Sequence, residues 1–274
     1  MTDLYAVIGN PISHTKSPAI HAAFAEATGQ DLAYVAIEGP LGGFAARVDR
    51  FRRDGGRGLN VTTPFKLDAF AYATDRSEDV ALAGAVNAMK FEGARVYAEN
   101  FDGVGLRTDI ERNLGFRLAG RRALMLGAGG AARGALKPFL DATPERLVIA
   151  NRTIDKARAL AAAFARHGDV TAADYADLSA LPPFDVVVNA TSASMFGQLP
   201  PIPGGSFGLG CLAYDLAYGK GLTPFLRLAR AAGAKRLADG VGMLVEQAAE
   251  AFAWWRGVRP ETRLIIDRLT IPLE

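Results

Sequence analysis

Ala123-Leu124-Met125-Leu126-Gly127-Ala128-Gly129-Gly130-Ala131-Ala132-Arg133-Gly134 is a short apolar run followed by a glycine-rich turn and an alanine-rich segment. This order predicts a buried strand, a tight turn and a helix. Gly127 allows the sharp turn, and Gly129 lets backbone N–H groups come close to a pyrophosphate. The stretch therefore predicts a dinucleotide-binding unit in a doubly wound α/β fold. A purely structural glycine turn is the alternative, since the chain contains 30 glycines.

The strand expected over residues 146–150 indicates which dinucleotide is bound. It leads into Asn151-Arg152-Thr153. An NAD-binding unit usually has an acidic residue here for the ribose 2′-hydroxyl, whereas an arginine makes a charge-assisted contact with a 2′-phosphate. Arg152, with Lys156 one helical turn later, therefore favours NADP. Two alternatives stay open: a solvated helix start capped by Thr153, and NAD binding through the nearby Asp155.

Composition excludes several classes of protein. The chain has 274 residues, 50% of them hydrophobic, which is enough for two domains. The 31 basic and 29 acidic residues form no run of like charge, so no nucleic-acid or membrane surface is expected. One cysteine and three dispersed histidines predict neither a disulfide nor a metal site. Without a signal segment or a long apolar run, the expected location is cytoplasmic.

Polar side chains follow the predicted strands of the first hundred residues. The strand over residues 5–8 leads into the loop Ser13-His14-Thr15-Lys16-Ser17, and a strand ending near residue 63 leads to Lys66. α/β proteins present groups to ligands at the carboxyl ends of strands, and hydroxyls suit a carboxylate or polyol. Simpler explanations stay open, because Ser17 is also a good helix N-cap and a lone lysine is usually solvated.

Three further candidates come from a predicted hairpin and a late helix. The hairpin strands expected over residues 84–88 and 95–100 bring in Asn87 and Asp102. A turn residue and a helix N-cap would explain these two equally well. In the helix expected over residues 243–255, Gln247 lies on an apolar stripe, either as a boundary residue or as an amide that faces a ligand.

Taken in order, these motifs resemble the shikimate 5-dehydrogenase family. The resemblance covers essentially the whole chain, and six or more motifs in the family's order make it specific. The matching motifs are Gly9-Asn-Pro-Ile-x-His-x-x-Ser-Pro-x-Ile-His21, Asn60-Val-Thr-x-Pro-Phe-Lys66, Gly84-Ala-Val-Asn87, Asn100-x-Asp-Gly-x-Gly105, Gly127-x-Gly-Gly-Ala131, Asn151-Arg-Thr153, Asn189-Ala-Thr-Ser192, Tyr214-Asp215 with Tyr218 and Thr223-Pro-Phe225, and Asp239-Gly-x-Gly-Met-Leu-Val-x-Gln247.

The resemblance implies reversible, NADPH-dependent reduction of 3-dehydroshikimate to shikimate, a step of aromatic amino-acid biosynthesis through chorismate. Lys66 and Asp102 are then the catalytic pair, with Lys66 donating a proton to the developing alkoxide and Asp102 orienting it. The implied substrate-binding residues are Thr15, Ser17, Thr62, Lys66, Asn87, Asp102, Tyr218 and Gln247. The implied NADP-binding residues are Gly127, Ala128, Gly129, Gly130, Ala131, Asn151, Arg152, Thr153, Lys156, Leu216, Gly240 and Glu78. A surface-helix position explains Glu78 equally well.

The resemblance also implies two domains. Residues 1–102 with 240–274 would form an α/β substrate-binding and catalytic domain, and residues 103–239 a Rossmann-type NADP-binding domain. Because the chain crosses twice between them, we expect the cleft between the domains to hold both ligands. The expected partner is a small molecule, with no nucleic acid and no membrane. The sequence leaves the oligomeric state open, and a homodimer is compatible with it.

Three departures from the family pattern keep alternatives open. Thr15 stands where many members have serine, and the hydroxyls of this loop are linked in the family with preference for shikimate or quinate. Phe101 removes a hydroxyl beside Asp102, and Ala193-Ser194 replaces the usual small pair near the nicotinamide. The alternatives are a broader quinate/shikimate dehydrogenase, a paralogue with another cyclohexene substrate, and a catalytically silent NADP(H)-binding regulator. The retained Lys66 and Asp102 argue against the regulator.

Overall fold

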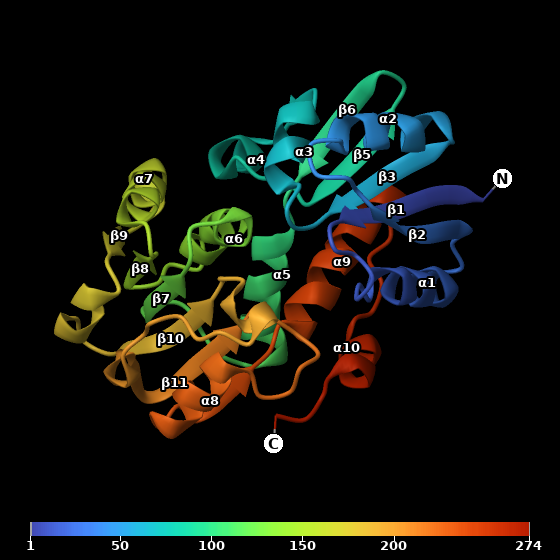
Figure 1. Cartoon of the computed structure of the whole chain (residues 1–274). Helices are drawn as coiled ribbons and strands as arrows, with labels where there is room; N and C mark the ends of the chain where they lie inside the picture. Colours follow the sequence, from blue (N-terminus) through green and yellow to red (C-terminus); the bar gives the residue numbers. More distant parts are fainter. Residues whose placement is uncertain (1, 274) are drawn as a thin grey trace.

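The computed structural model describes residues 2–273, and for Met195 it describes the backbone alone. Two six-stranded sheets form two lobes. Two helices, α5 (Asp102–Thr108) and α9 (Val241–Arg256), run side by side between the lobes (Figure 1). The two-lobed α/β architecture predicted from the sequence is therefore confirmed.

The first sheet has the strand order β2-β1-β3-β5-β6-β4. Strand β1 pairs in parallel with β2 and β3, whereas β5 runs antiparallel to β3 and β6. One face of the sheet buries Ala6 and Ile8 under α2, α3 and α4. The bounds are β1 Asp3–Gly9, α1 Ser17–Thr28, β2 Leu32–Glu38, α2 Phe44–Arg53, β3 Gly56–Val61, α3 Lys66–Tyr72, β4 Asp75–Arg76, α4 Glu78–Ala83, β5 Ala88–Glu92 and β6 Arg95–Glu99.

The second sheet is entirely parallel, in the order β12-β11-β10-β7-β8-β9. Counted along the chain, this is the 3-2-1-4-5-6 order of a Rossmann fold. Helices α6 and α7 cover one face, and α8 covers the other. The bounds are β7 Arg122–Leu126, α6 Gly130–Leu140, β8 Arg146–Ala150, α7 Ile154–Phe164, β9 Val170–Ala173, β10 Phe184–Asn189, β11 Phe207–Asp215, α8 Pro224–Ala231 and β12 Arg236–Ala238, with short helical turns η2 Ala165–His167, η3 Ala176–Ala180, η4 Ala193–Phe196 and η5 Gly204–Ser206.

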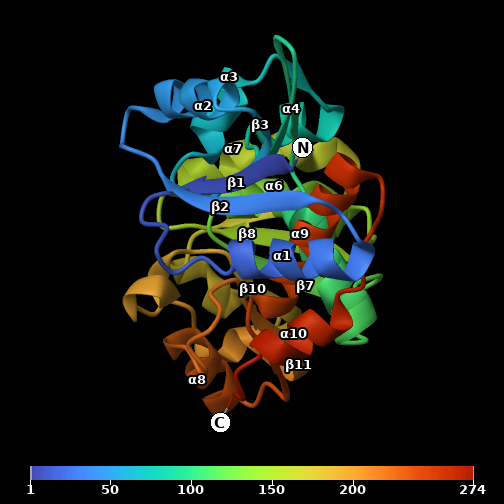
Figure 2. The same cartoon turned by 90° about the vertical axis from the view of Figure 1, so that its right-hand side faces the viewer.

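The helix α9 joins the two lobes. Its Met243 lies in the core of the second sheet, whereas its Trp255 stacks on Tyr5 of β1, with ring centroids 4.8 Å apart. At its end, Arg256 Nη1 lies 2.5 Å from the Asp3 carboxylate. Figure 2 shows α1 and α10 (Arg263–Leu269) beside it, and these three helices share one apolar core. The last helices of the chain therefore complete the first lobe.

Glycines allow the helix α5 and its continuation to approach α9 closely, and Gly105 is one of them. A Cβ atom at Gly105 would lie 2.7 Å from the Gln247 backbone nitrogen, which is closer than real Cβ contacts. After Thr108 the helix continues as one π-helical turn, η1 (Asp109–Asn113). The glycine thus sets the spacing that lets Asp102 and Gln247 lie near one another.

Several predicted local features differ from the structure. The strand expected over residues 84–88 begins only at Ala88, because Gly84 ends α4 with a φ of 62° and the next residues form a turn. Ser17 is not the N-cap of α1: Lys16 takes that position, and Ser17 lies inside the helix. Strand β9 was not predicted at all. Within residues 2–273, none of the helices combines the length and apolar character needed to cross a lipid bilayer.

Candidate active site

Lys66 and Asp102 form an ion pair where the two lobes meet. Lys66 is the first residue of α3, and Asp102 is the first residue of α5. The Lys66 Nζ atom donates to Asp102 Oδ2, and the two side chains are only 13% and 7% exposed. Such a partly desolvated pair interacts more strongly than an exposed one. The structure therefore joins two residues that lie 36 positions apart.

Two amide side chains complete this arrangement. Asn87 Nδ2 donates to Asp102 Oδ1 at 2.8 Å and to Gln247 Oε1 at 3.1 Å. Its Oδ1 atom accepts the Phe101 N–H at 2.8 Å, so the orientation of the amide is fixed. Gln247 in turn donates to the Leu244 carbonyl at 2.8 Å. We call Lys66, Asp102, Asn87 and Gln247 the polar cluster.

Asn60 extends the polar cluster, although it is not among the predicted site residues. It is buried in β3, donates to the Asn87 carbonyl at 3.3 Å and accepts the Tyr34 hydroxyl at 2.7 Å. The available signal is an amide between two apolar residues of β3, Leu59 and Val61. The ring of His21 stacks on Tyr34 at 4.1 Å, and neither of its nitrogens has a hydrogen-bond partner among residues 2–273. Burial lowers the pKa of His21 to about 3.

The other predicted substrate-binding residues lie near the start of α1, after β3 and beside α9. Thr15 Oγ1 donates to Ser17 Oγ at 3.2 Å and accepts the Ser17 N–H at 3.3 Å. Tyr218 is half-buried against the core shared by α1 and α9, and burial raises the pKa of its phenol. Thr62 follows β3, and its methyl group would contact a Cβ at Gly9. In the described part of the chain, none of these four residues is hydrogen-bonded to the polar cluster.

The glycine-rich turn has the geometry that a pyrophosphate requires. Gly127 adopts a φ of 106° and donates its N–H to the Ala150 carbonyl at 2.7 Å. Gly129 precedes α6 without a side-chain cap, so the first N–H groups of α6 are available to a ligand. A Cβ at Gly129 would meet nothing within 4 Å, whereas one at Gly130 would lie 3.4 Å from the Lys66 side chain. The open turn therefore fits a dinucleotide and borders the polar cluster.

The predicted 2′-phosphate residues are exposed at the end of β8. Asn151 donates to the Thr153 carbonyl at 2.9 Å, which shapes the turn. Arg152 and Lys156 form no ion pair with the residues that the structure describes. Asp155 forms an ion pair with Arg158 at 3.2 Å. Its carboxylate therefore already has a partner other than a ribose hydroxyl. We call residues 151–156 the phosphate segment.

The remaining cofactor candidates divide into two groups. Leu216 and Gly240 lie against each other, because a Cβ at Gly240 would overlap the Leu216 carbonyl. Glu78 is exposed in the first turn of α4, and within residues 2–273 it forms no hydrogen bond or ion pair with the glycine-rich turn, although α4 packs against α6. In the same part of the chain, no group of three or more histidine, cysteine, aspartate or glutamate side chains could hold a metal ion.

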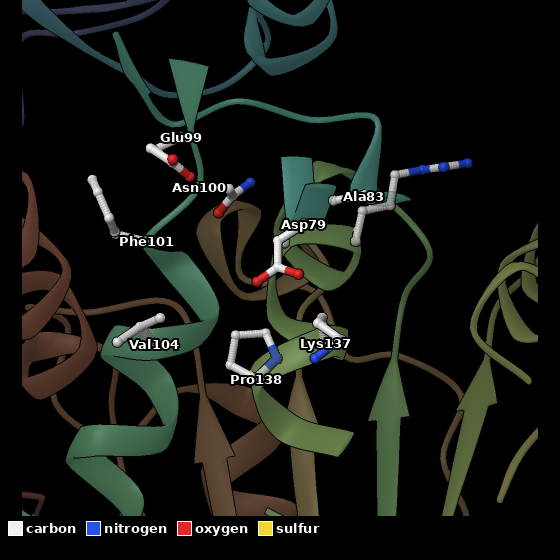
Figure 3. Close-up of a pocket in the computed structure, with 10 residues that line it drawn as sticks. Asp79, Ala83, Glu99, Asn100, Phe101, Val104, Lys137 and Pro138 are labelled. Carbon is white, nitrogen blue, oxygen red and sulfur yellow. The ribbon is translucent and has the colours of Figure 1, made fainter. Parts of the chain in front are cut away.

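A separate cavity of about 210 Å³ lies between α4, α5 and α6 (Figure 3). Phe101 lines it from just before α5, Val104 from α5, and Lys137 and Pro138 from α6. Neither Lys66 nor Asp102 lines this cavity. Phe101 also packs edge-on against Trp254, with centroids 5.8 Å apart. The residue that departs from the family pattern beside Asp102 therefore belongs to this cavity and to the α9 contact.

Comparison with known proteins gives the family. The substrate-binding domain of shikimate dehydrogenase matches residues 7–89, shikimate/quinate 5-dehydrogenase matches residues 109–196, and the shikimate 5′-dehydrogenase C-terminal domain matches residues 240–270. The shikimate dehydrogenase (NADP(+)) of Nitrosospira multiformis is 55% identical over 269 residues, which are 98% of each chain. The chain belongs to the shikimate dehydrogenase family. The resemblance inferred from the motifs is thus confirmed.

Solved structures agree with the shikimate dehydrogenase fold over the whole length. The Ael1 enzyme from Pseudomonas putida is 61% identical, covers 100% of both chains and gives a TM-score of 0.92. Shikimate 5-dehydrogenase from Thermus thermophilus, solved with NADP(H) and shikimate, is 32% identical over 97% of this chain and 98% of that chain, with a TM-score of 0.86. The same two lobes therefore occur in a family member that binds both ligands.

Proposed function

We propose that this chain catalyses the reversible NADP-dependent interconversion of shikimate and 3-dehydroshikimate. One observation carries the proposal: the buried Lys66–Asp102 pair directly borders an open, uncapped glycine-rich turn. A proton donor beside a dinucleotide site is what reduction of a ketone needs. The relative from Nitrosospira multiformis is named for this activity, which supports the substrate.

The polar cluster supplies the acid chemistry. NADPH, when bound, supplies the hydride that reduces the substrate ketone. Lys66 stabilises negative charge on the carbonyl oxygen and gives it a proton from Nζ, and Asp102 holds the ammonium group in place. Asn87 and Gln247 keep their amides oriented toward ring hydroxyls, because each has a fixed hydrogen-bond partner. In the reverse direction, Lys66 accepts the hydroxyl proton.

Separate groups hold the carboxylate and the cofactor. Thr15, Ser17 and Tyr218 offer hydroxyl donors to the substrate carboxylate, and the burial that raises the Tyr218 pKa keeps that phenol protonated. Thr62 offers a further hydroxyl to the ring. The first N–H groups of α6 suit a pyrophosphate, and Arg152 with Lys156 suits the 2′-phosphate. Leu216 and Gly240 flank the nicotinamide, whereas the exposed Glu78 has the weakest support.

Quinate is the second candidate substrate. Thr15 adds a methyl group to a pocket that is usually lined by serine, and Phe101 replaces a hydroxyl beside Asp102. The first change alters the carboxylate pocket, the second lies at the separate cavity and the α9 contact, and neither removes a proton donor. A silent NADP(H)-binding regulator has less support, since such a protein needs no buried lysine and aspartate pair beside the dinucleotide turn. The cytoplasmic location, the homodimer and the domain boundaries at residues 102 and 240 stay predictions.

The test is an initial-rate assay with shikimate or quinate and with NADP+ or NAD+ in all four combinations. We expect rapid turnover only with shikimate and NADP+. Turnover with quinate as well would transfer the proposal to the broader dehydrogenase, and Thr15→Ser would then be compared with the native chain. Tight NADPH binding without turnover of either substrate would exclude the enzymatic proposal and support the regulator.

A further inference from the structure

One carboxylate ties together the ends of β10 and β11. Asp215 is the last residue of β11 and is completely buried. Ser194 Oγ and Thr223 Oγ1 each donate to Asp215 Oδ2 at 2.6 Å. Asn189 Nδ2 donates to Oδ1 at 3.1 Å, and the Ala217 N–H donates to the same atom at 3.2 Å. Four donors from different parts of the chain therefore converge on one side chain.

Three of these donors belong to two loops at the carboxyl edge of the second sheet, and the fourth, Asn189, is the last residue of β10. Ser194 lies in η4, directly after β10, whereas Ala217 and Thr223 lie at the two ends of the loop after β11. Thr223 also caps α8, because its hydroxyl accepts the Leu226 N–H at 3.2 Å. A buried carboxylate is costly unless its lone pairs are filled. The four donors offset that cost and fix both loops relative to β11.

The same two loops border the cofactor candidates. A Cβ at Gly127 would lie 3.1 Å from the Ala190 carbonyl oxygen, so the first loop lies against the glycine-rich turn. The second loop donates the Leu216 N–H to the Asn189 carbonyl at 3.0 Å. Its Ala217 carbonyl accepts the Gly240 N–H at 3.1 Å. Residues 190–194, 216–217 and 240 therefore lie next to one another, and Asp215 holds the two loops that carry most of them. We call this group of residues the wall.

The sheet order indicates which part of a dinucleotide this wall faces. In a Rossmann sheet, the dinucleotide lies across the carboxyl edge at the point where the strand order reverses. That point lies between β7 and β10. The phosphate segment follows β8 on one side of it. The opposite half of the dinucleotide, which carries the nicotinamide, then lies over the ends of β10 and β11.

We infer that Asp215 is a positioning residue for the nicotinamide half of NADP. The inference rests on the proposed function and goes beyond it, because Asp215 acts only through the loops that it holds. Without the Asp215 carboxylate, residues 190–194 and 216–217 lose the hydrogen bonds that fix their position. The phosphate segment is anchored independently on β8, so binding of the adenosine half is unaffected.

The experiment compares two ligands on the native chain, Asp215→Asn and Ser194→Ala. The probes are NADPH, followed by its fluorescence, and adenosine 2′,5′-bisphosphate, followed by calorimetry. Loss of buried hydrogen bonds to a charged acceptor predicts about tenfold weaker NADPH binding and about tenfold lower kcat for Asp215→Asn. Binding of the adenosine fragment is expected to stay within about twofold, since its contacts are intact. Ser194→Ala should show the same pattern with a smaller effect.

Two further variants separate positioning from general stability. Thr223→Ser keeps both the hydroxyl and the helix cap, so NADPH binding and kcat should stay at the native values. Asp185→Asn removes a carboxylate from the other end of β10, where it accepts the Arg122 N–H at 2.9 Å. This control can lower the melting temperature, but the ratio of the two affinities should not change. If Asp215→Asn does not fold, Ser194→Ala decides the question.

The outcomes separate this inference from the proposed function. Selective loss of NADPH affinity supports the positioning role even if the native chain oxidises no shikimate, in which case only the proposed function fails. Equal weakening of both ligands would mean that Asp215 merely stabilises the lobe. Unchanged NADPH affinity and kcat in a folded Asp215→Asn or Ser194→Ala chain would overturn the inference, while shikimate turnover by the native chain would leave the proposed function intact.

Discussion

The polar cluster and the phosphate segment differ in almost every physical respect. Lys66 and Asn87 come from the first lobe, Asp102 from α5 and Gln247 from α9, and these largely buried side chains are linked by hydrogen bonds. Arg152 and Lys156 come from one turn and its helix, are exposed and form no ion pair in the described part of the chain. In the proposed function, the buried groups act on the reacting bond, and their hydrogen bonds hold them in position before the ligand binds. The exposed cations recognise only a charge, and no ion pair among the described residues positions them beforehand.

This difference assigns separate duties to the two regions. A preorganised buried cluster contributes mainly to the transition state, so its loss lowers kcat. An exposed cation contributes to binding in the ground state and the transition state alike, so its loss raises KM. Three predictions test this division, from the largest expected effect to the smallest, and a fourth concerns the stability of the buried ring that packs beside Tyr34.

Replacing the proton donor should have the largest effect. Lys66→Met keeps the length of the side chain but removes the ammonium group, and we expect kcat for shikimate to fall by about 10³-fold or more. The KM for NADP+ should change little. Lys137→Met is the control, since that lysine pairs with Asp141 at 2.6 Å outside the polar cluster. Near-native turnover of Lys66→Met would end the assignment of Lys66 as the acid.

Removing the charge of its partner should cost somewhat less. Asp102→Asn keeps the size of the side chain but leaves the Lys66 ammonium beside an uncharged amide, and we expect kcat/KM for shikimate to fall by about 10²-fold. Steady-state rates across pH 6 to 9 measure the effect. The double variant with Lys66→Met should be no slower than Lys66→Met alone, because the pair acts as a unit. Additive losses would show that Asp102 acts independently.

The phosphate segment should respond in KM instead. Arg152→Gln removes a charge-assisted contact with the 2′-phosphate, and we expect KM for NADP+ to rise about 10- to 50-fold while KM for NAD+ stays nearly constant. Arg158→Gln, six residues later in α7 and paired with Asp155, is the matched control. Equal changes for both dinucleotides would place the 2′-phosphate elsewhere.

The smallest effect concerns stability and comes from the buried His21 ring. The pKa of His21 is lowered by burial to about 3, below its unfolded value of about 6.5. The unfolded chain therefore binds the extra proton first, and this contribution to stability is lost as the pH falls from about 6.5 towards 3, by up to about 1.4 kcal/mol per pH unit. Urea unfolding at pH 7 and pH 5 measures it. His21→Leu should show a flatter pH dependence than the native chain, and parallel curves would contradict the prediction.

Local sequence signals predicted much of the fold. The apolar run before Gly127 and the small residues after it define β7, its turn and the start of α6, because that geometry depends on neighbouring residues. By contrast, β9 is four residues long, and half of them are alanine. Such a short segment carries too little periodicity to be separated from a loop.

The functional contacts were harder to predict, because they join distant parts of the chain. Patterns at single strand ends made Lys66 and Asp102 weak candidates, and only the family resemblance paired them. Asn60 received no role, since its partners Tyr34 and Asn87 lie 26 and 27 residues away. The convergence on Asp215 joins donors from residues 189 to 223, and no periodicity marks it. The spacing of apolar residues predicts individual helices and strands. Hydrogen bonds between distant loops can be identified only in the folded chain.

The position of α9 has a consequence for the order in which the protein is made. The strands of the second lobe are contiguous in the chain, so this lobe can fold once about residue 240 has left the ribosome. The first lobe emerges earlier but must wait, since Trp255 and Arg256 supply the contacts to Tyr5 and Asp3. Until then, the aromatic face around His21 and Phe24 is open to water. We therefore expect the first lobe, although it is synthesised first, to complete its folding last. Chaperones should bind mainly to its uncovered face around His21 and Phe24.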